Sequence, residues 1–202
     1  MILLVGLGNP GKGYADNRHN FGFMAADEII RRHSFSPERI RFQGLVSEGR
    51  IGSEKLLLLK PTTYMNDSGR AVCEAAKFYK IPPENVIVLH DELDLPLGKV
   101  RTKTGGGHGG NNGIRSIDAH MGKNFKRIRL GIGHPGDKNL VSSHVLKDFS
   151  KAERDIANKI VDSIARHIDL MVQGDDAGFM NKVSLDTAAL RPQKPAKTSK
   201  GD

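Results

Sequence analysis

The sequence predicts a single α/β domain in which a twisted, mixed and largely parallel sheet is flanked by helices. Residues 2–5 and 86–89 are short, continuous apolar runs, which is the pattern of strands covered on both faces. Segments with the spacing of amphipathic helices lie between such runs. The chain has 202 residues and 38% hydrophobic residues, enough to bury one core, and no linker divides it. We expect one domain over residues 1–185.

The N-terminal strand, 2–5, leads into a glycine-rich loop that holds Asn9. Residues 6–11 match the form of a dinucleotide-binding fingerprint, but the next helix is expected only from about Phe21, and no acidic residue ends a second strand at the required distance. The hypothesis that the protein is a nucleotide-dependent oxidoreductase therefore depends on an incomplete motif. The polar segment between this loop and the expected helix places His19 just before the helix begins.

A hairpin and a helix are expected next. Residues 45–51 and 55–60 read as two strands joined across a short turn. The loop that follows carries Met65 and Asn66 just beyond a strand end, and Asp67 or Ser68 can cap the following helix. Taken by itself, Asn66 is better interpreted as a turn residue.

The strand at 86–89 is the centre of the prediction. Ligands of open α/β sheets bind beyond the carboxyl ends of the strands, and this strand ends in an acidic stretch, 91–97. Asp91 is therefore the first candidate for a functional carboxylate. The neighbouring acidic residues lack the spacing of a recognised metal site, so we expect no metal and no cofactor.

A strongly basic segment follows. Eight basic residues and one acidic residue lie between positions 99 and 129, so this segment carries +7 of the chain's net charge of +8. Two strands are expected there, 98–104 and 127–133, and on each of them the charges alternate with apolar or small residues and so share a face. Such a face suits a phosphate backbone, although an ordinary solvated sheet face has the same pattern. The candidates for contact with such a backbone are Lys99, Arg101, Lys103 and Arg129.

The two basic strands are separated by a glycine loop, residues 105–113. Six glycines in nine residues are entropically costly to order, so we expect either a close backbone approach to a ligand or a flexible hinge. Asn112 is expected at the N-terminus of the helix that follows. Ser150 and Glu153 form a capping box for a long helix through about Val172, and residues 186–202 are expected to be a disordered basic tail.

The cellular setting follows from what the sequence lacks. Cys73 is the single cysteine and cannot form an intrachain disulfide, no targeting signal is recognisable, and no apolar run could cross a bilayer. We expect a cytoplasmic protein without membrane contact.

Five motifs together resemble bacterial peptidyl-tRNA hydrolase over about residues 1–185. They are GLGNPGKGYADNRHN, KPTTYMNDSG, HDELDLPLG, GGGHGGNNG and RIRLGIGHPGDKN. The resemblance implies a monomeric enzyme without metal that hydrolyses the ester joining a peptide to the terminal ribose of tRNA and so recycles tRNA during translation.

The resemblance also implies residue roles. His19 corresponds to the catalytic base, Asp91 to its carboxylate partner and Asn9 to a polar group at the scissile ester. Further pocket residues are Tyr14, Met65, Asn66 and Asn112. Arg101, Lys103 and Arg129 match positions that hold the tRNA, and Lys99 lies in the same basic segment. Asn111 stands where the family often has histidine.

The chemistry of these residue types agrees with such an enzyme. An imidazole, with a reference pKa of about 6.5, can deprotonate water near neutral pH, and a carboxylate can fix its tautomer. No serine lies in a nucleophile elbow and Cys73 falls within a predicted helix, so direct attack by water is expected. An RNA-binding module without catalysis remains the alternative that the charge alone would support.

Overall fold

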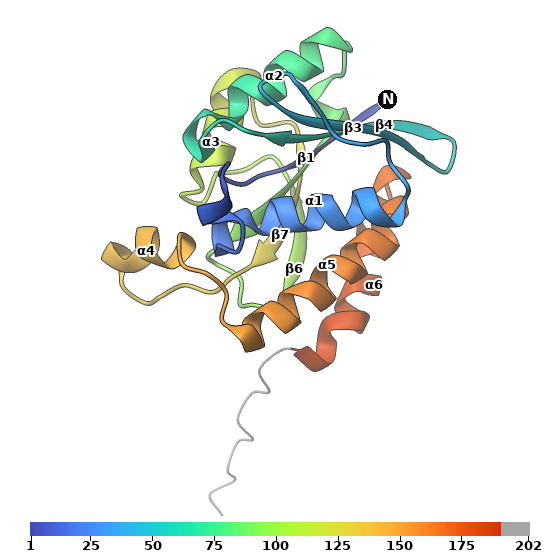
Figure 1. Ribbon diagram of the computed structural model, residues 1–202. Helices are drawn as coiled ribbons and strands as arrows, with labels where there is room; N and C mark the ends of the chain where they lie inside the picture. Colours follow the sequence, from blue (N-terminus) through green and yellow to red (C-terminus); the bar gives the residue numbers. More distant parts are fainter. Residues whose placement is uncertain (191–202) are drawn as a thin grey trace, which may run out of the picture.

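The computed structural model describes residues 1–190 and has a seven-stranded mixed sheet at its centre (Figure 1). The strand order is β2-β3-β4-β1-β5-β7-β6. The neighbours β4, β1, β5 and β7 are parallel, whereas β2, β3 and β6 join their neighbours antiparallel. The strands are β1 Ile2–Gly6, β2 Arg39–Arg41, β3 Gly44–Ile51, β4 Glu54–Pro61, β5 Val86–Glu92, β6 Val100–Thr104 and β7 Lys126–Gly131. The predicted fold class is confirmed.

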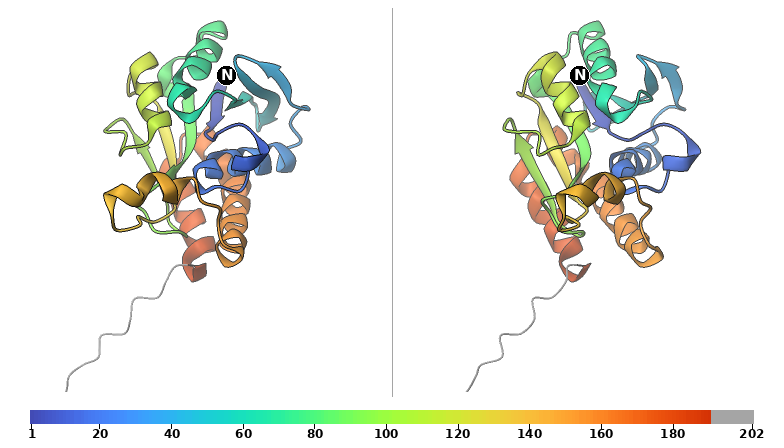
Figure 2. Two further views of the ribbon diagram at one scale, coloured as in Figure 1. Left: turned by 60° about the vertical axis from the view of Figure 1, so that its left-hand side comes forward. Right: turned by 90° about the vertical axis from the view of Figure 1, so that its left-hand side faces the viewer.

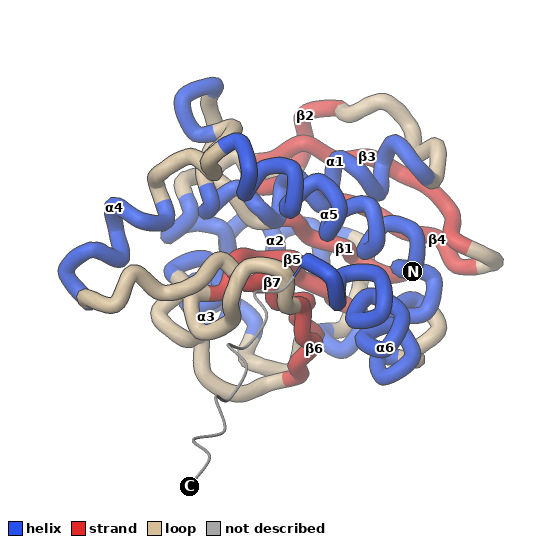
Figure 3. The backbone as a smooth tube through the Cα atoms, turned by 90° about the horizontal axis from the view of Figure 1, so that it is seen from below, coloured by secondary structure: helices blue, strands red, loops and turns tan. Residues whose placement is uncertain are grey.

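Helices cover both faces of the sheet. They are α1 Phe21–Arg32, α2 Ser68–Phe78, α3 Asn112–Met121, α4 Val141–Val145, α5 Lys151–Val172 and α6 Asp176–Thr187. Single 3₁₀ turns are η1 Lys12–Tyr14, η2 Arg18–Asn20, η3 Met65–Asp67, η4 Pro83–Asn85, η5 Lys138–Leu140 and η6 Ala188–Leu190. Helices α1, α5 and α6 pack on one face, which Figure 3 shows from below, and α2 and α3 pack on the other.

The alternation of side chains along the central strands builds two cores. In β5, Ile87 and Leu89 point into the core with α1 and α5, whereas Val86 and Val88 point into the core with α2 and α3. All four side chains are almost fully buried, as the continuous apolar run predicted.

Several predicted boundaries are corrected. The acidic stretch does not begin as a loop, because Asp91 and Glu92 still pair with β7 as the last two residues of β5. Asn112 is the first residue of α3, as expected, and Asn111 is the N-cap residue, a role that was not predicted from the sequence. The predicted tail boundary at residue 186 falls inside α6, and residues 191–202 lie outside the described residues.

The parallel strands direct four loops to one end of the sheet. The loops after β4, β1, β5 and β7 all leave from the carboxyl ends of these strands. Figure 2 shows the blue segment after β1, the yellow-green helix α3 and the gold helix α4 around this end. This is the position at which open α/β sheets bind their ligands.

Helix α1 lies unusually close to the sheet. A Cβ atom added at Gly22 in the first turn of α1 would lie 2.6 Å from the backbone nitrogen and the backbone oxygen of Leu7, and a Cβ at Gly6 would lie 2.5 Å from the carbonyl oxygen of Gly22. Two glycines that face each other therefore allow β1 and α1 to touch through their backbones. This contact sets the position of η2, which carries His19, directly before α1.

We predict that Gly22→Ala lowers the free energy of unfolding by about 3 kcal/mol, the upper part of the usual range for overpacking a core. The added methyl group would meet backbone atoms, which cannot rotate out of the way. Urea unfolding of the variant measures the change. Gly13→Ala is the matched control, because a Cβ at that position meets no atom within 4 Å. An equally stable Gly22→Ala protein would contradict the proposed close approach.

Candidate active site

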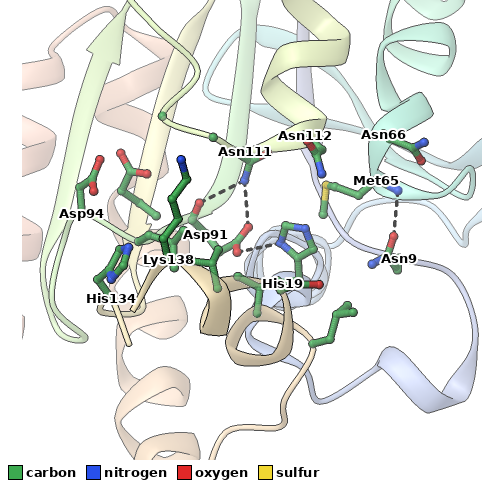
Figure 4. A pocket seen from close by; sticks show the side chains of 18 of the residues that line it. Asn9, His19, Met65, Asn66, Asp91, Asp94, Asn111, Asn112, His134 and Lys138 are labelled. Atoms are coloured by element: carbon green, nitrogen blue, oxygen red, sulfur yellow. Dashed lines mark hydrogen bonds and ion pairs between the residues drawn. The ribbon is translucent and has the colours of Figure 1, made fainter. Parts of the chain in front are cut away.

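A cleft of about 650 Å³ lies at the carboxyl end of the parallel strands. Each of the four parallel strands supplies side chains to it, from its end or from the loop that follows. The end of the glycine loop, residues 109–112, and α4 with its flanking residues complete the lining (Figure 4). Of the predicted site residues, the lining includes Asn9, His19, Met65, Asn66, Asp91 and Asn112. The structure thus gathers into one cleft six residues from five separate places in the sequence.

His19 and Asp91 are in direct contact in this cleft. Nδ1 of His19 lies 2.8 Å from Oδ2 of Asp91. Because a carboxylate only accepts hydrogen bonds, Nδ1 of a neutral imidazole carries the proton and Nε2 keeps its lone pair. Both residues are buried, with 8% of His19 and 3% of Asp91 exposed. The imidazole therefore has the tautomer of a general base.

The pKa of His19 reflects two opposing effects. Burial lowers the pKa of the imidazole, and the negative charge of Asp91 and the hydrogen bond to it raise the pKa. The net result is a pKa above the ordinary value of 6.5. Asp91 therefore makes His19 a stronger base than burial alone would allow.

Asn9 is held rigidly from two sides. Its backbone nitrogen donates to Oδ1 of Asn20 at 2.8 Å, and its carbonyl oxygen accepts from Nδ2 of Asn20 at 3.0 Å. The side-chain Oδ1 of Asn9 accepts from the backbone nitrogen of Met65 at 2.8 Å. This bond fixes the amide orientation, so Nδ2 is the group left to donate, and it has no hydrogen-bond partner among residues 1–190.

The other two predicted amides are free to adapt. Asn66 and Asn112 are both in the cleft lining, and neither side chain makes a hydrogen bond within the described part of the chain. Met65 lies between Asn9 and Gly113. Its backbone nitrogen is bonded to Asn9, and its sulfur would lie 2.6 Å from a Cβ atom added at Gly113. The cleft thus combines one rigid amide donor with two adaptable ones.

Tyr14 and the predicted tRNA-binding cations do not line the cleft. Tyr14 lies in η1, outside the cleft lining. Arg101 and Lys103 lie on the edge strand β6, opposite Arg129 and Arg127 of β7. This pairing puts the charges of the two strands on one face, as the alternation predicted.

Arg127 is a buried member of this basic face. Its side chain is 3% exposed and donates to the carbonyl oxygen of Gly105 at 2.8 Å, so it supports the glycine loop from below. Arg129 contacts Glu92 at 3.4 Å. Lys103 is exposed and has no ion-pair partner within residues 1–190.

Three cleft features were absent from the sequence interpretation. His134 and Lys138 come from the loop after β7, and α4 adds Val141 and Val145. The same rule that selected Asp91, proximity to the carboxyl end of a parallel strand, applies to the loop after β7 and could have found the two basic residues. In Figure 4 both lie beside Asp94, at the end of the cleft away from Asn9.

Neither a metal site nor a membrane span is found in the described part of the chain. No group of three or more His, Cys, Asp or Glu side chains among residues 1–190 is arranged to hold a metal ion. Across the same residues, each helix is too short or too polar to cross a bilayer.

Comparisons with known proteins agree with this geometry. Residues 3–193 match the family described as peptidyl-tRNA hydrolase. The peptidyl-tRNA hydrolase of Parvibaculum lavamentivorans is 61% identical over 203 residues, which cover 100% of this chain and 98% of that protein. That of Bradyrhizobium diazoefficiens is 62% identical over 185 residues, 92% of each chain. The crystal structure of peptidyl-tRNA hydrolase from Acinetobacter baumannii superposes with a TM-score of 0.86 at 43% identity, covering 91% of this chain and 94% of that one.

We predict that His19 titrates above 6.5 and that Asp91→Asn moves its pKa below 6.5, because the charge of Asp91 is lost while the burial that lowers the pKa remains. NMR titration of the assigned imidazole resonances measures both values. His90 is the internal reference, since burial lowers its pKa to about 4 and it should stay neutral through the same range. An unchanged His19 pKa in Asp91→Asn would disprove the electrostatic coupling.

Proposed function

The chain belongs to the peptidyl-tRNA hydrolase family, and from this we propose that His19, oriented by Asp91, activates the water that cleaves the ester of peptidyl-tRNA. The protein is a carboxylic ester hydrolase acting on peptidyl-tRNA, which releases the peptide and recycles the tRNA. The observation that carries the mechanism is the 2.8 Å contact between His19 and Asp91 inside a cleft.

In the proposed reaction, Nε2 of His19 takes a proton from a water molecule, and the water oxygen attacks the ester carbonyl carbon. The imidazolium that forms is stabilised by the carboxylate of Asp91. The tetrahedral intermediate then collapses, the bond to the ribose oxygen breaks, and the imidazolium returns its proton to that oxygen. Atoms and charges balance without a covalent enzyme intermediate or a cofactor.

The rigid amide of Asn9 is assigned to the developing negative charge. Its Nδ2 is oriented before the reaction begins, because Oδ1 is already bonded to Met65. A donor that is already oriented stabilises an oxyanion better than solvent molecules that must first reorient. A neutral donor also leaves the base unperturbed, whereas a cation at this position would lower the pKa of His19.

Substrate binding is divided between the adaptable amides and the basic edge of the sheet. Asn66 and Asn112 can pair with the peptide amide that distinguishes peptidyl-tRNA from ordinary aminoacyl-tRNA. Lys99, Arg101, Lys103 and Arg129 are assigned to phosphates of the tRNA, and Tyr14 to the rim of the site once substrate is bound. The proposal includes a monomeric state and action in the cytoplasm, where translation supplies the substrate.

The alternative of an RNA-binding module without catalysis explains the basic segment but not the cleft. Phosphate binding does not require a buried imidazole that is hydrogen-bonded to a carboxylate. The hydrolase explains both features.

The first expected outcome is that the protein cleaves tRNA esterified to an N-acylated amino acid and leaves tRNA esterified to a free amino acid intact. His19→Ala should lower kcat for the acylated substrate by about 10²- to 10⁴-fold, the usual scale of general-base catalysis. Release of the acylated amino acid is followed directly. His33→Gln is a matched control, because His33 lies at the end of α1 and away from the cleft lining. Full activity of His19→Ala would rule out the proposed base.

The second expected outcome concerns Lys103. Lys103→Ala should raise KM with kcat nearly unchanged, because phosphate contacts exist equally in the ground state and the transition state. The dependence of KM on salt should weaken in the same variant. Lys159→Ala, an exposed change of equal charge on α5, is the control. A large loss in kcat with Lys103→Ala would place this residue at the reacting ester instead.

A further inference from the structure

The glycine loop ends at Asn111, whose side chain contacts the carboxylate of the catalytic pair. Nδ2 of Asn111 lies 3.2 Å from Oδ1 of Asp91 and 3.3 Å from its backbone oxygen. The other carboxylate oxygen, Oδ2, is the one bonded to His19. Asp91 is therefore held between an amide on one oxygen and an imidazole on the other, as Figure 4 shows.

The orientation of the Asn111 amide is determined by α3. Its Oδ1 accepts a hydrogen bond from the backbone nitrogen of Ile114 at 3.1 Å and so caps the helix. With the oxygen committed to the helix, the nitrogen must face Asp91. One side chain thus anchors α3 and donates to the catalytic carboxylate at the same time.

The backbone of Asn111 is also fixed. Its nitrogen donates to the carbonyl oxygen of His108 at 3.0 Å, and its own carbonyl oxygen accepts from Arg115 at 3.0 Å. Only 8% of the residue is exposed. Gly109 and Gly110 precede it with φ values of 59° and 80°, a conformation that favours glycine. The glycine loop therefore follows a defined path that ends with the Asn111 amide on Asp91.

We propose that Asn111 is a positioning residue that holds the Asp91 carboxylate in the rotamer required by His19. This inference rests on the proposed role of the His19 and Asp91 pair. A carboxylate bonded through one oxygen can rotate away from the imidazole, whereas one bonded through both oxygens and supported at its backbone cannot do so without breaking several hydrogen bonds. An amide does not titrate, so its support of Asp91 does not vary with pH.

The test must separate the contact with Asp91 from the cap of α3. Asn111→Ser does this, because a serine hydroxyl can accept the hydrogen bond from Ile114 but is too short to reach Asp91. Asn111→Ala loses both contacts and reports on the cap. The thermal unfolding midpoint of Asn111→Ser should stay close to that of the unmodified protein, and that of Asn111→Ala should fall.

For Asn111→Ser, we expect kcat toward N-acylated aminoacyl-tRNA to fall by about 10- to 100-fold, the scale for a small misplacement of a reacting group, with KM nearly unchanged. The acid limb of the pH profile of kcat/KM should move to lower pH. A carboxylate that leaves His19 no longer raises its pKa, while burial still lowers it. A purely structural role would reduce the amount of folded protein and leave the pH profile in place.

A double-mutant cycle with Asp91→Ala completes the test. If Asn111 acts through Asp91, adding Asn111→Ser to Asp91→Ala should cost no further activity. Suppose that Asp91→Ala strongly lowers activity, whereas Asn111→Ser keeps a normal rate and pH profile. This result would overturn the positioning role of Asn111 and leave the proposed mechanism intact. Normal activity of Asp91→Ala itself would overturn the mechanism.

Discussion

The proposed mechanism depends on one contact, the hydrogen bond between His19 and Asp91, and this contact depends on how closely α1 approaches the sheet. His19 belongs to the turn that precedes α1, and Asp91 to the end of β5, 72 positions later in the sequence. The two glycines at the crossing, Gly6 and Gly22, let the backbones of β1 and α1 touch. A side chain on either would move the helix outward, and with it the imidazole. A hydrogen bond tolerates only a few tenths of an ångström of such displacement.

The sequence predicted the general location of the site because that location follows from topology. Parallel strands end at the same edge, so polar residues after several apolar runs are brought together whatever the details of packing. Asn9, Asn66 and Asp91 were placed in the cleft by this reasoning, and His19 by its position at a helix start. The family resemblance then assigned their roles, which topology alone does not give.

What the sequence did not predict depends on single-residue register and side-chain direction. Asn111 and Asn112 are adjacent, identical in type and both part of the cleft lining. Only Asn111 caps α3 and donates to Asp91, whereas the Asn112 side chain makes no hydrogen bond within residues 1–190. Helix starts cannot be read from sequence to one residue, so the two could not be distinguished. The alternation along β7 predicted the face on which Arg127 lies. Its burial under the glycine loop could not be predicted, because the path of that loop is not visible in the sequence. Helix α4 has only five residues, too few for a recognisable amphipathic period.

The distribution of charge along the cleft fits the proposal that a general base operates next to a polyanionic substrate. Apart from Asp91, the polar side chains labelled on the His19 side of the cleft are the neutral amides of Asn9, Asn111 and Asn112, whereas the basic side chains His134 and Lys138 lie at the far end beside Asp94. Positive charge is needed to hold phosphates, but a cation next to the imidazole would lower its pKa and weaken the base. Glu92 and Asp94 face the same basic end, and burial together with the charge of Asp94 raises the pKa of Glu92. These two carboxylates offset part of the positive field of Lys138, which lines the cleft, and of Arg129, which contacts Glu92. The basic end of the cleft therefore weakens the proposed base less than uncompensated cations would.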